Sequence, residues 1–396
     1  MNLLVVTNLY PPQELGGYGR SMADFVWGLR DRGHSIQVLS SDAPHLGASS
    51  GLGPSGESVD RRLQLKGSYE GGVQNLQDPQ QRQAIDQANA TLIRSWLNSQ
   101  HWDGILLGNL DLLGPELLPV LLEAQCIVQH HVGFVHAPFP PSACPDNERY
   151  RLVAASYAVR SALVSAGLPS SEASVVYPGV RSELFGVDRV GMPTPLAPDG
   201  SRQRPLKVCF AGLLMGSKGA HTLIEALITL QQQGVSVQAS LAGDSFQSGY
   251  REQLEQWLKQ QHLDGAVQFV GQLGRQALAR FYALHHVGVF PSIHPEAFGI
   301  VGAEMMASGL VVVSSGVGGA GELIDDGRTG LRFQAGDSQG LARCLMRLAT
   351  DTTLLNGLRQ AGQREAQQRF SVTASAKALE AGFRPNAAQN SETAIF

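Results

Sequence analysis

The chain is poor in charged side chains. Only 16% of its 396 residues are Asp, Glu, Lys or Arg, whereas an average soluble protein has about 25%. Thirty basic and 34 acidic side chains leave a formal net charge of -4, so the protein has no bulk attraction for the phosphate backbone of nucleic acid. We therefore expect no nucleic-acid partner, and any site for an anion must be built locally.

Cysteine is also scarce, and the four cysteines form no C-x-x-C pair. Their spacing favours neither a zinc site nor a disulfide framework, and it predicts buried thiols in a reducing cytosol. The pattern D-x-D is absent as well, so a divalent cation that chelates a sugar diphosphate has no obvious ligands. We expect no metal site, and we expect amides and cations to neutralise any bound anion.

No long apolar run is present. The stretch richest in apolar residues, 104–128, contains two prolines and three acidic residues, whereas a membrane-spanning helix needs about 20 predominantly apolar residues. Met1 leads directly into an apolar segment typical of a strand, without the basic leader of a secretory signal. The sequence predicts a cytoplasmic protein with no transmembrane segment, and peripheral membrane contact stays open.

What the sequence does contain is a regular alternation of strands and helices. Within the first forty residues, an apolar strand, a Pro/Gly loop, an amphipathic helix and a second strand follow one another. Such a βαβ unit implies a parallel sheet with helices on its faces. Residues 42–83 interrupt the pattern, and their Gly, Ser, Gln and Pro content predicts a long loop with at most short elements.

The alternation divides the chain into two α/β domains, in line with the two or three domains that its length allows. The first covers residues 1–186, a Pro- and Gly-rich linker covers 187–205, and the second domain covers 206–371. A helix is expected at 372–382 and can pack back on the first domain. Residues 384–396 are expected to be a disordered tail. Ligands of such parallel sheets bind beyond the carboxyl ends of the strands.

The strongest functional signal is the segment 295–304, Pro-Glu-Ala-Phe-Gly-Ile-Val-Gly-Ala-Glu, after a strand at 287–290. Its carboxylates, Glu296 and Glu304, stand eight positions apart, and Gly299 precedes the expected helix. The free amides of a first helical turn favour an anion such as a nucleotide phosphate. Glu296 and Glu304 then suit the hydroxyls of a sugar and of a ribose. Two lone glutamates would ordinarily be helix surface residues, but the surrounding sequence favours a ligand site.

A second anion-binding candidate is the loop from Gly212 to Gly219, between a strand at 207–211 and a helix. Lys218 is one of only five lysines, and from this loop its ammonium can reach a pyrophosphate as a point charge. The P-loop spacing G-x-x-x-x-G-K-[ST] is absent. The alternative is a solvated lysine at a helix start.

Two weaker candidates lie in the first half. Gly16 and Gly17 precede the first helix, and their amides can cradle a phosphate or an acceptor hydroxyl. A structural tight turn is the alternative, and a dinucleotide fingerprint is a poor match because G-x-G-x-x-G is absent. His130 and His131 lie where a strand ends, with His136 slightly further along. One of these histidines suits a sugar hydroxyl, and the other two are expected to be structural.

Together these segments resemble the retaining glycosyltransferases of family 4, over nearly the whole chain. Residues 296–304 match the family's E-x7-E motif, and 318–324 and 326–330 resemble its G-G-x-x-E and D-G-x-T-G segments. The family has the GT-B fold, two facing Rossmann-like domains with parallel sheets and an interdomain cleft. The resemblance thus implies an acceptor-binding first domain and a nucleotide-sugar-binding second domain.

The resemblance also implies roles for residues of the second domain. Glu296 would contact the donor sugar near the reacting centre, and Glu304 would hold the nucleotide ribose. Lys218 would bind the diphosphate. Backbone amides for sugar and phosphate would come from Phe298, Gly299 and Ile300. Gly212 is also expected to bind the nucleotide sugar.

In the first domain, the loop with Gly16 and Gly17 resembles the family's acceptor and phosphate loop. His131 would touch the donor sugar or the reacting region. It is preferred to His130 because residues 131–138 resemble the family's H-D-x-x-x-x-x-P stretch, although Val132 replaces the usual acid.

The implied activity is transfer of a sugar from a nucleoside diphosphate sugar to an acceptor hydroxyl, with retention of configuration and without a metal or a further cofactor. The acceptor, whether a saccharide, a lipid or a small molecule, is not encoded in any motif. The chain departs from the family at Leu213, where an arginine usually accompanies the lysine. A degenerate nucleotide-sugar-binding or scaffold protein is therefore the main alternative. An epimerase or phosphorylase with this fold should show other motifs.

Overall fold

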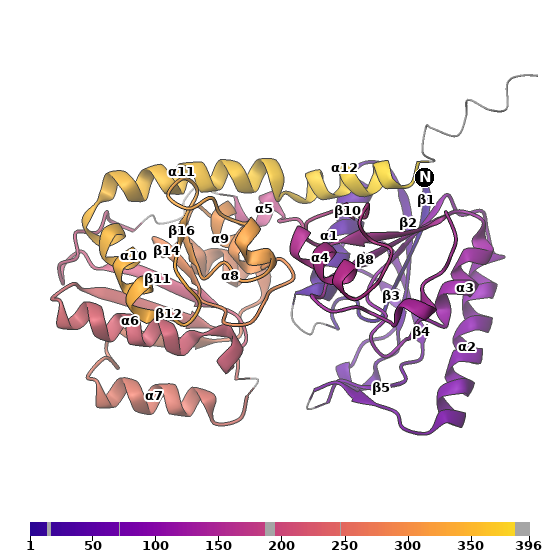
Figure 1. Ribbon diagram of the computed structural model, residues 1–396, viewed down its shortest axis with the longest axis horizontal. Coiled ribbons are helices and arrows are strands. Elements are labelled where there is room, and N and C mark those ends of the chain that lie inside the picture. Colours follow the sequence, from indigo (N-terminus) through magenta and orange to yellow (C-terminus); the bar gives the residue numbers. More distant parts are fainter. Residues whose placement is uncertain (14–16, 71, 187–194, 246, 385–396) are drawn as a thin grey trace, which may run out of the picture. The chain divides into compact units, whose positions relative to one another are not determined.

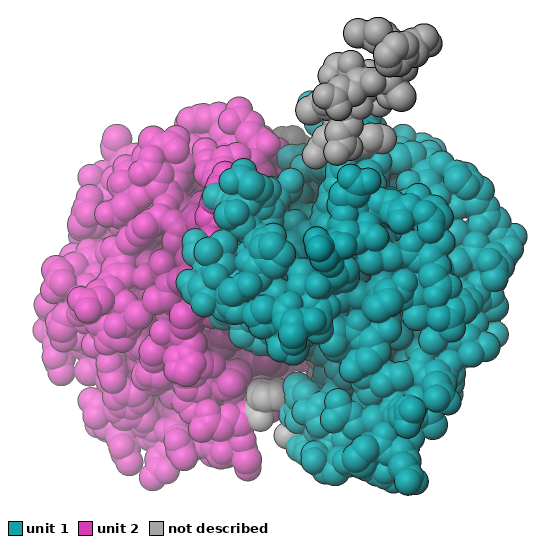
Figure 2. Space-filling view, turned by 45° about the vertical axis from the view of Figure 1, so that its right-hand side comes forward, with its two compact units in different colours: residues 1–155, 159–177, 373–396 teal, residues 156–158, 178–372 magenta. Residues whose placement is uncertain are grey.

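A computed structural model describes residues 1–13, 17–70, 72–186, 195–245 and 247–384. Gly16, residues 187–194 of the expected linker and nearly all of the expected disordered tail lie outside these residues. The chain forms two compact units, which Figure 2 colours separately. Unit 1 comprises Met1–Ala155, Val159–Tyr177 and the chain from Thr373 on, and unit 2 comprises Ser156–Ala158 and Pro178–Val372.

Unit 1 is built on an eight-stranded sheet with the order β10-β9-β8-β7-β1-β2-β4-β3. All neighbouring strands are parallel except β3 and β4. The strands of unit 1 are β1 (Asn2–Thr7), β2 (Ser35–Ser41), β3 (Gly51–Leu52), β4 (Ser58–Leu63), β7 (Gly104–Leu107), β8 (Ile127–Val132), β9 (Tyr150–Ala154) and β10 (Ser174–Val175), with a separate antiparallel pair of β5 (Gly67–Ser68) and β6 (Gln74–Asn75). The strand order changes direction at β1, which has β2 on one side and β7 on the other.

The helices of unit 1 are α1 (Tyr18–Asp31), α2 (Pro79–Leu97), α3 (Leu117–Leu121), α4 (Tyr157–Ser165) and α12 (Val372–Gly382). Figure 1 shows α2 and α3 side by side, and the two helices are in contact. The helix expected at 372–382 is present. Its residues Ala376 and Leu379, with Phe383, are buried in the same apolar cluster as Leu3 and Val5 of β1.

The prediction of a long loop over 42–83 was wrong for β4, which extends the main sheet beside β2. The sequence pattern did not predict this strand because it carries buried charged residues in place of an apolar run. Arg61 is buried and donates hydrogen bonds to the carbonyl oxygen of Tyr10 (2.9 Å) and to Gln13 Oε1 (2.7 Å). These bonds compensate for the loss of hydration.

Unit 2 contains a fully parallel six-stranded sheet with the order β13-β12-β11-β14-β15-β16. Its strands are β11 (Leu206–Ala211), β12 (Val237–Ala242), β13 (Val267–Gly271), β14 (Val287–Phe290), β15 (Val311–Ser314) and β16 (Leu331–Arg332). Its helices are α5 (Ser182–Phe185), α6 (Ala220–Gln232), α7 (Tyr250–Gln260), α8 (Arg275–Tyr282), α9 (Ile300–Ala307), α10 (Ser338–Thr350) and α11 (Thr352–Arg369). The α/β fold with parallel sheets is thus confirmed.

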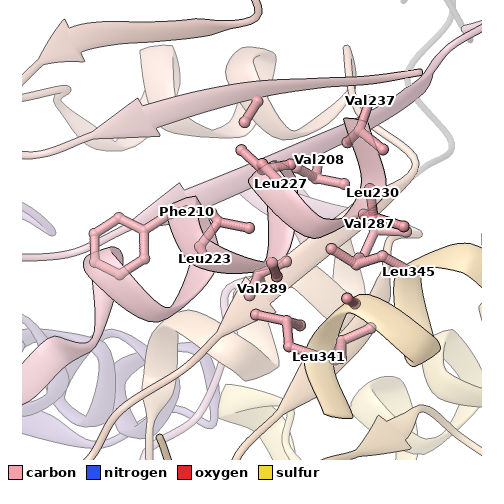
Figure 3. Packing of buried hydrophobic residues seen from close by; sticks show 14 of the residues in the cluster. Val208, Phe210, Leu223, Leu227, Leu230, Val237, Val287, Val289, Leu341 and Leu345 are labelled. Atoms are coloured by element: carbon pink, nitrogen blue, oxygen red, sulfur yellow. The ribbon is translucent and has the colours of Figure 1, made fainter. Parts of the chain in front are cut away.

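Helix α6 packs against the second sheet through an apolar face. Leu223, Leu227 and Leu230 recur at helical spacing and form one apolar face, which is buried. Figure 3 shows this face with valines of β11 and β14 and with Leu341 and Leu345 of α10. The core lies between helices and sheet, which leaves the strand ends for a ligand.

No helix in the described parts of the chain is both long enough and apolar enough to cross a membrane.

Shortening one buried side chain of the unit 2 core tests this packing. Leu223→Ala removes a fully buried side chain and should lower the free energy of unfolding by about 2–5 kcal/mol, because the cavity is only partly refilled. Leu284→Ala is the matched control, since Leu284 is 47% exposed, and it should change stability by no more than about 0.5 kcal/mol. Urea unfolding followed by circular dichroism measures both, and equal effects would contradict the assignment of the core.

Candidate functional site

The candidate site of unit 2 lies at the point where its strand order changes direction. β11 has β12 on one side and β14 on the other, so the loops after β11 and β14 leave the sheet on either side of a gap. Lys218 follows β11, and Glu296 follows β14. The fold therefore brings together two residues that are 78 positions apart in the sequence.

Lys218 and Glu296 form an ion pair. Lys218 Nζ donates a hydrogen bond to Glu296 Oε1 over 2.6 Å. The side chain of Lys218 is 32% exposed and that of Glu296 is 15% exposed. The ammonium therefore remains accessible to a ligand, while the carboxylate is largely enclosed by the protein.

Two serines complete the support of Glu296, and sequence analysis missed both. Ser292 Oγ donates a hydrogen bond to the same Oε1 atom over 2.6 Å. Ser315 Oγ in turn donates to the carbonyl oxygen of Ser292 over 2.6 Å. Both serines lie close to strand ends, since Ser292 is two residues after β14 and Ser315 comes directly after β15. Their position after predicted strands was the signal that could have found them.

Glycines allow a second loop to approach the backbone of Glu296. Gly319 N donates to Glu296 O over 2.7 Å, and Glu296 N donates to Val317 O over 3.3 Å. A Cβ atom on Gly318 would lie 2.5 Å from Glu296 O, and one on Gly319 would lie 2.1 Å from Ala297 O. The glycine pair is therefore required for this contact.

The segment after Glu296 turns into α9 at Gly299, whose φ of 91° is in the left-handed region. Phe298 is buried and packs edge-on against Phe370, with ring centroids 5.3 Å apart. Ile300 is the first residue of α9, and the amides of such a first turn lack partners within the helix. Glu304 is only 2% exposed, so the interpretation of Glu304 as a solvated surface residue is excluded.

Gly212 lies immediately after β11, with its N–H donating to Ala242 O over 3.0 Å. Its carbonyl oxygen is approached so closely by Gly243 that a Cβ atom there would lie 1.8 Å away. Leu213, where the resembling family has arginine, is partly exposed. Among the described residues, no group of three or more His, Cys, Asp or Glu side chains could hold a metal ion.

The predicted residues of unit 1 that the structure describes lie at the start of α1 and in β8. Gly17 directly precedes α1 and its carbonyl oxygen accepts from Ser21 N over 3.0 Å. His130 and His131 are fully buried in β8. His130 Nδ1 is 2.7 Å from Tyr150 Oη, and His131 Nε2 is 2.9 Å from Val176 O. These contacts are typical of structural histidines, and contact of His131 with a sugar stays a prediction.

Burial lowers the pKa of both histidines, to about 3 for His130 and about 4 for His131, because a charged imidazolium would lose its hydration. Both rings are therefore neutral near pH 7. A neutral ring can donate one hydrogen bond and accept another, but it offers no charge to a diphosphate.

Comparison with known proteins finds glycosyltransferases. Residues 197–365 match the family "Glycosyl transferases group 1". A glycogen synthase of Mycobacterium tuberculosis (strain H37Rv) is 27% identical over 376 residues, which cover 89% of this chain and 86% of that protein. A D-inositol 3-phosphate glycosyltransferase of Streptomyces avermitilis is 30% identical over 200 residues, which cover 49% of this chain and 43% of that protein.

Two solved structures have the same fold as this chain. The Anabaena protein Alr3699/HepE in complex with UDP has a TM-score of 0.74 at 22% identity, covering 96% of this chain and 99% of that one. Sucrose-phosphate synthase from Thermosynechococcus elongatus has a TM-score of 0.69 at 18% identity, covering 96% and 98%.

The buried histidines generate a prediction about pH. The unfolded chain titrates His131 near 6.5 and the folded chain near 4, so between these values the unfolded state binds more protons. The free energy of unfolding should therefore fall as the pH drops from about 6.5 to 4. His131→Asn should reduce this fall. Unfolding of both proteins in urea at pH 7 and pH 5 measures the difference.

His101→Asn is the matched control, since the side chain of His101 is 87% exposed. It should keep the pH dependence of the parent protein. An unchanged pH dependence in His131→Asn would show that burial does not keep this ring neutral.

Proposed function

We propose that this protein, a glycosyltransferase with the GT-B fold, is an enzyme of the retaining family 4 type. It moves a sugar from a nucleoside diphosphate sugar to an acceptor hydroxyl, and it needs no metal ion. The observation that carries this proposal is the cluster of Lys218, Glu296 and Ser292 at the direction change of the unit 2 sheet.

Lys218 is the cation for the leaving diphosphate. Its ammonium is partly exposed, and the first turn of α9 adds backbone amides from Gly299 and Ile300. Negative charge on the leaving group grows in the transition state, so a fixed cation and fixed amides stabilise that state more than the bound donor. This neutralisation replaces the divalent cation for which the sequence has no D-x-D pattern.

Glu296 holds the donor sugar. One of its oxygens already accepts hydrogen bonds from Lys218 and Ser292, which fixes the orientation of the carboxylate and reduces its strength as a nucleophile. The other oxygen suits a sugar hydroxyl. A carboxylate held in this way supports attack by the acceptor hydroxyl on the face of the sugar from which the diphosphate departs. An oxygen of the leaving diphosphate assists removal of the acceptor proton. Attack on this face retains the configuration of the sugar.

Glu304 is assigned to the ribose of the nucleotide. A carboxylate that is 2% exposed loses much of its hydration, and hydrogen bonds from ribose hydroxyls compensate for that loss. Phe298, packed against Phe370, fixes the backbone that leads into α9.

UDP is the first nucleotide to test. Solved structures of Alr3699/HepE, which share the fold of this chain, contain UDP and UDP-glucose. Leu213 supports the second candidate, a binding protein without turnover, because an arginine donor is missing there and the loss of even one oxyanion donor costs about 2.7–4 kcal/mol. Release of UDP from UDP-glucose separates the two, since a binding protein would be stabilised by UDP and would release none.

Substitutions at the ion pair test the catalytic assignment. Glu296→Gln and Lys218→Ala should each reduce the rate of UDP release by about 100-fold or more, because each removes a charge at the reacting group. Lys259→Ala is the matched control, since Lys259 is exposed on α7, and it should retain the parent rate. The rates are measured by coupled detection of UDP, and full activity of Lys218→Ala would refute the role of the ammonium. EDTA should leave the parent rate unchanged.

Ser292 is expected to act as a positioning residue. Ser292→Ala removes a hydrogen bond to a carboxylate, worth about 1.5–3 kcal/mol, and should lower kcat by roughly tenfold or more while the donor KM changes little. Ser292→Thr keeps a hydroxyl and should recover part of the loss. A rise in KM with unchanged kcat would instead indicate that Ser292 supports only ground-state binding.

A further inference from the structure

Unit 1 has its own direction change at the carboxyl ends of β1 and β7, the neighbouring strands at which the sheet order reverses. Val6 is paired with Leu107 in the register of these strands. Asn8 follows β1 and Asn109 follows β7, so the two amides lie at the same edge on either side of the gap. Ligands of parallel sheets bind at such a place.

Tyr69 joins the two sides of this edge. Asn8 Nδ2 donates to Tyr69 Oη over 2.7 Å, and Tyr69 Oη donates to Asp111 O over 3.3 Å. The backbone N–H of Tyr69 donates to His45 Nε2 over 3.2 Å. The loops after β1, β2 and β7 are therefore held together by hydrogen bonds to one tyrosine, two through its phenol and one through its backbone N–H.

Asn109 is 5% exposed, yet its side-chain amide makes no hydrogen bond to any residue that the structure describes. Neither polar atom of this amide is among the fully buried side-chain atoms that lack a hydrogen bond. The amide is therefore reachable at the strand edge, where a ligand can pair with it.

Asp111 lies two residues further and is partly buried. Burial raises the pKa of its carboxyl group, and His136 counteracts this effect electrostatically. Within the described chain, no hydrogen bond reaches the Asp111 carboxylate. Asn109 and Asp111 thus provide an amide and a carboxylate two positions apart in the loop after β7, both with free hydrogen-bonding capacity.

The charge close to the Asp111 carboxylate disfavours an anionic ligand at that position. Lys66 is buried with its ammonium 2.8 Å from Asp86 and 2.7 Å from Glu116. The guanidinium of Arg61 is engaged by Tyr10 O and Gln13 Oε1. A phosphate placed beside the Asp111 carboxylate would meet like charge.

We propose that Asn109 and Asp111 form the binding subsite for a neutral, polyhydroxylated acceptor, whose hydroxyl groups donate to the carboxylate and exchange hydrogen bonds with the amide. This inference rests on the proposed function, since it assigns the acceptor of the same reaction. It restricts the acceptor to the non-phosphorylated class.

Binding to the full-length protein loaded with UDP tests this assignment. Two matched pairs of probes are used, glucose with glucose 6-phosphate and myo-inositol with myo-inositol 1-phosphate, and saturation-transfer NMR reports which of them bind. At least one neutral member should bind at least tenfold more tightly than its phosphorylated partner. Asp111→Asn and Asn109→Ala should each weaken that binding by about fivefold or more.

Asp146→Asn is the matched control, because Asp146 is exposed and precedes β9, at the opposite edge of the same sheet. It should bind the neutral probe like the parent protein. Stabilisation of each variant by UDP in a thermal-shift measurement shows that it is folded. If Asp111→Asn lacks that stabilisation, Asn109→Ala carries the test.

The outcomes separate this inference from the proposed function. Tighter binding of the phosphorylated probe, no binding by either neutral probe, or unchanged binding in both variants would overturn the neutral-acceptor subsite while stabilisation by UDP persists. If UDP neither stabilises the protein nor is released from UDP-glucose, it is the proposed function that fails.

Discussion

The ion pair between Lys218 and Glu296 is the interaction on which the candidate site depends. Each residue follows a different parallel strand, and the sheet brings the two strand ends together. Without a ligand, the ammonium and the carboxylate satisfy each other over 2.6 Å. A donor with a negative diphosphate and neutral sugar hydroxyls can use both groups, because it supplies an anion for the first and hydrogen-bond donors for the second.

The backbone around this pair is as specific as its side chains. Gly318 and Gly319 are needed because the loops after β14 and β15 approach each other more closely than a side chain permits. Gly299 is needed because its φ is 91° and a Cβ atom there would lie 2.7 Å from the Phe290 ring. Ser315 connects the same two loops by a hydrogen bond of 2.6 Å to Ser292 O, and Ser292 Oγ donates to Glu296 over 2.6 Å. These contacts hold the Glu296 carboxylate rigidly, and such preorganisation is what electrostatic stabilisation of a transition state requires.

Much of the fold and part of the site could be predicted from the sequence. Apolar strands and amphipathic helices such as α6 gave clear periodicity, and the glycines and acids of 295–304 indicated a candidate site that stays a prediction. β4 was missed because its buried Arg61 is satisfied by a distant loop, which no local pattern reveals. Ser292 was missed for a similar reason, since a serine after a strand gains meaning only through the carboxylate that it contacts.

The sequence by itself determined the parallel α/β architecture and the carboxylate, lysine and glycine chemistry of the second unit, because periodicity and motif spacing are local properties. Only the tertiary structure decided which groups meet. It paired Lys218 with Glu296 and buried His130 and His131 as neutral rings. It also brought Asn8, Tyr69 and Asp111 to one edge of the first sheet. These outcomes depend on contacts between residues far apart in the chain, which strand order and packing alone establish.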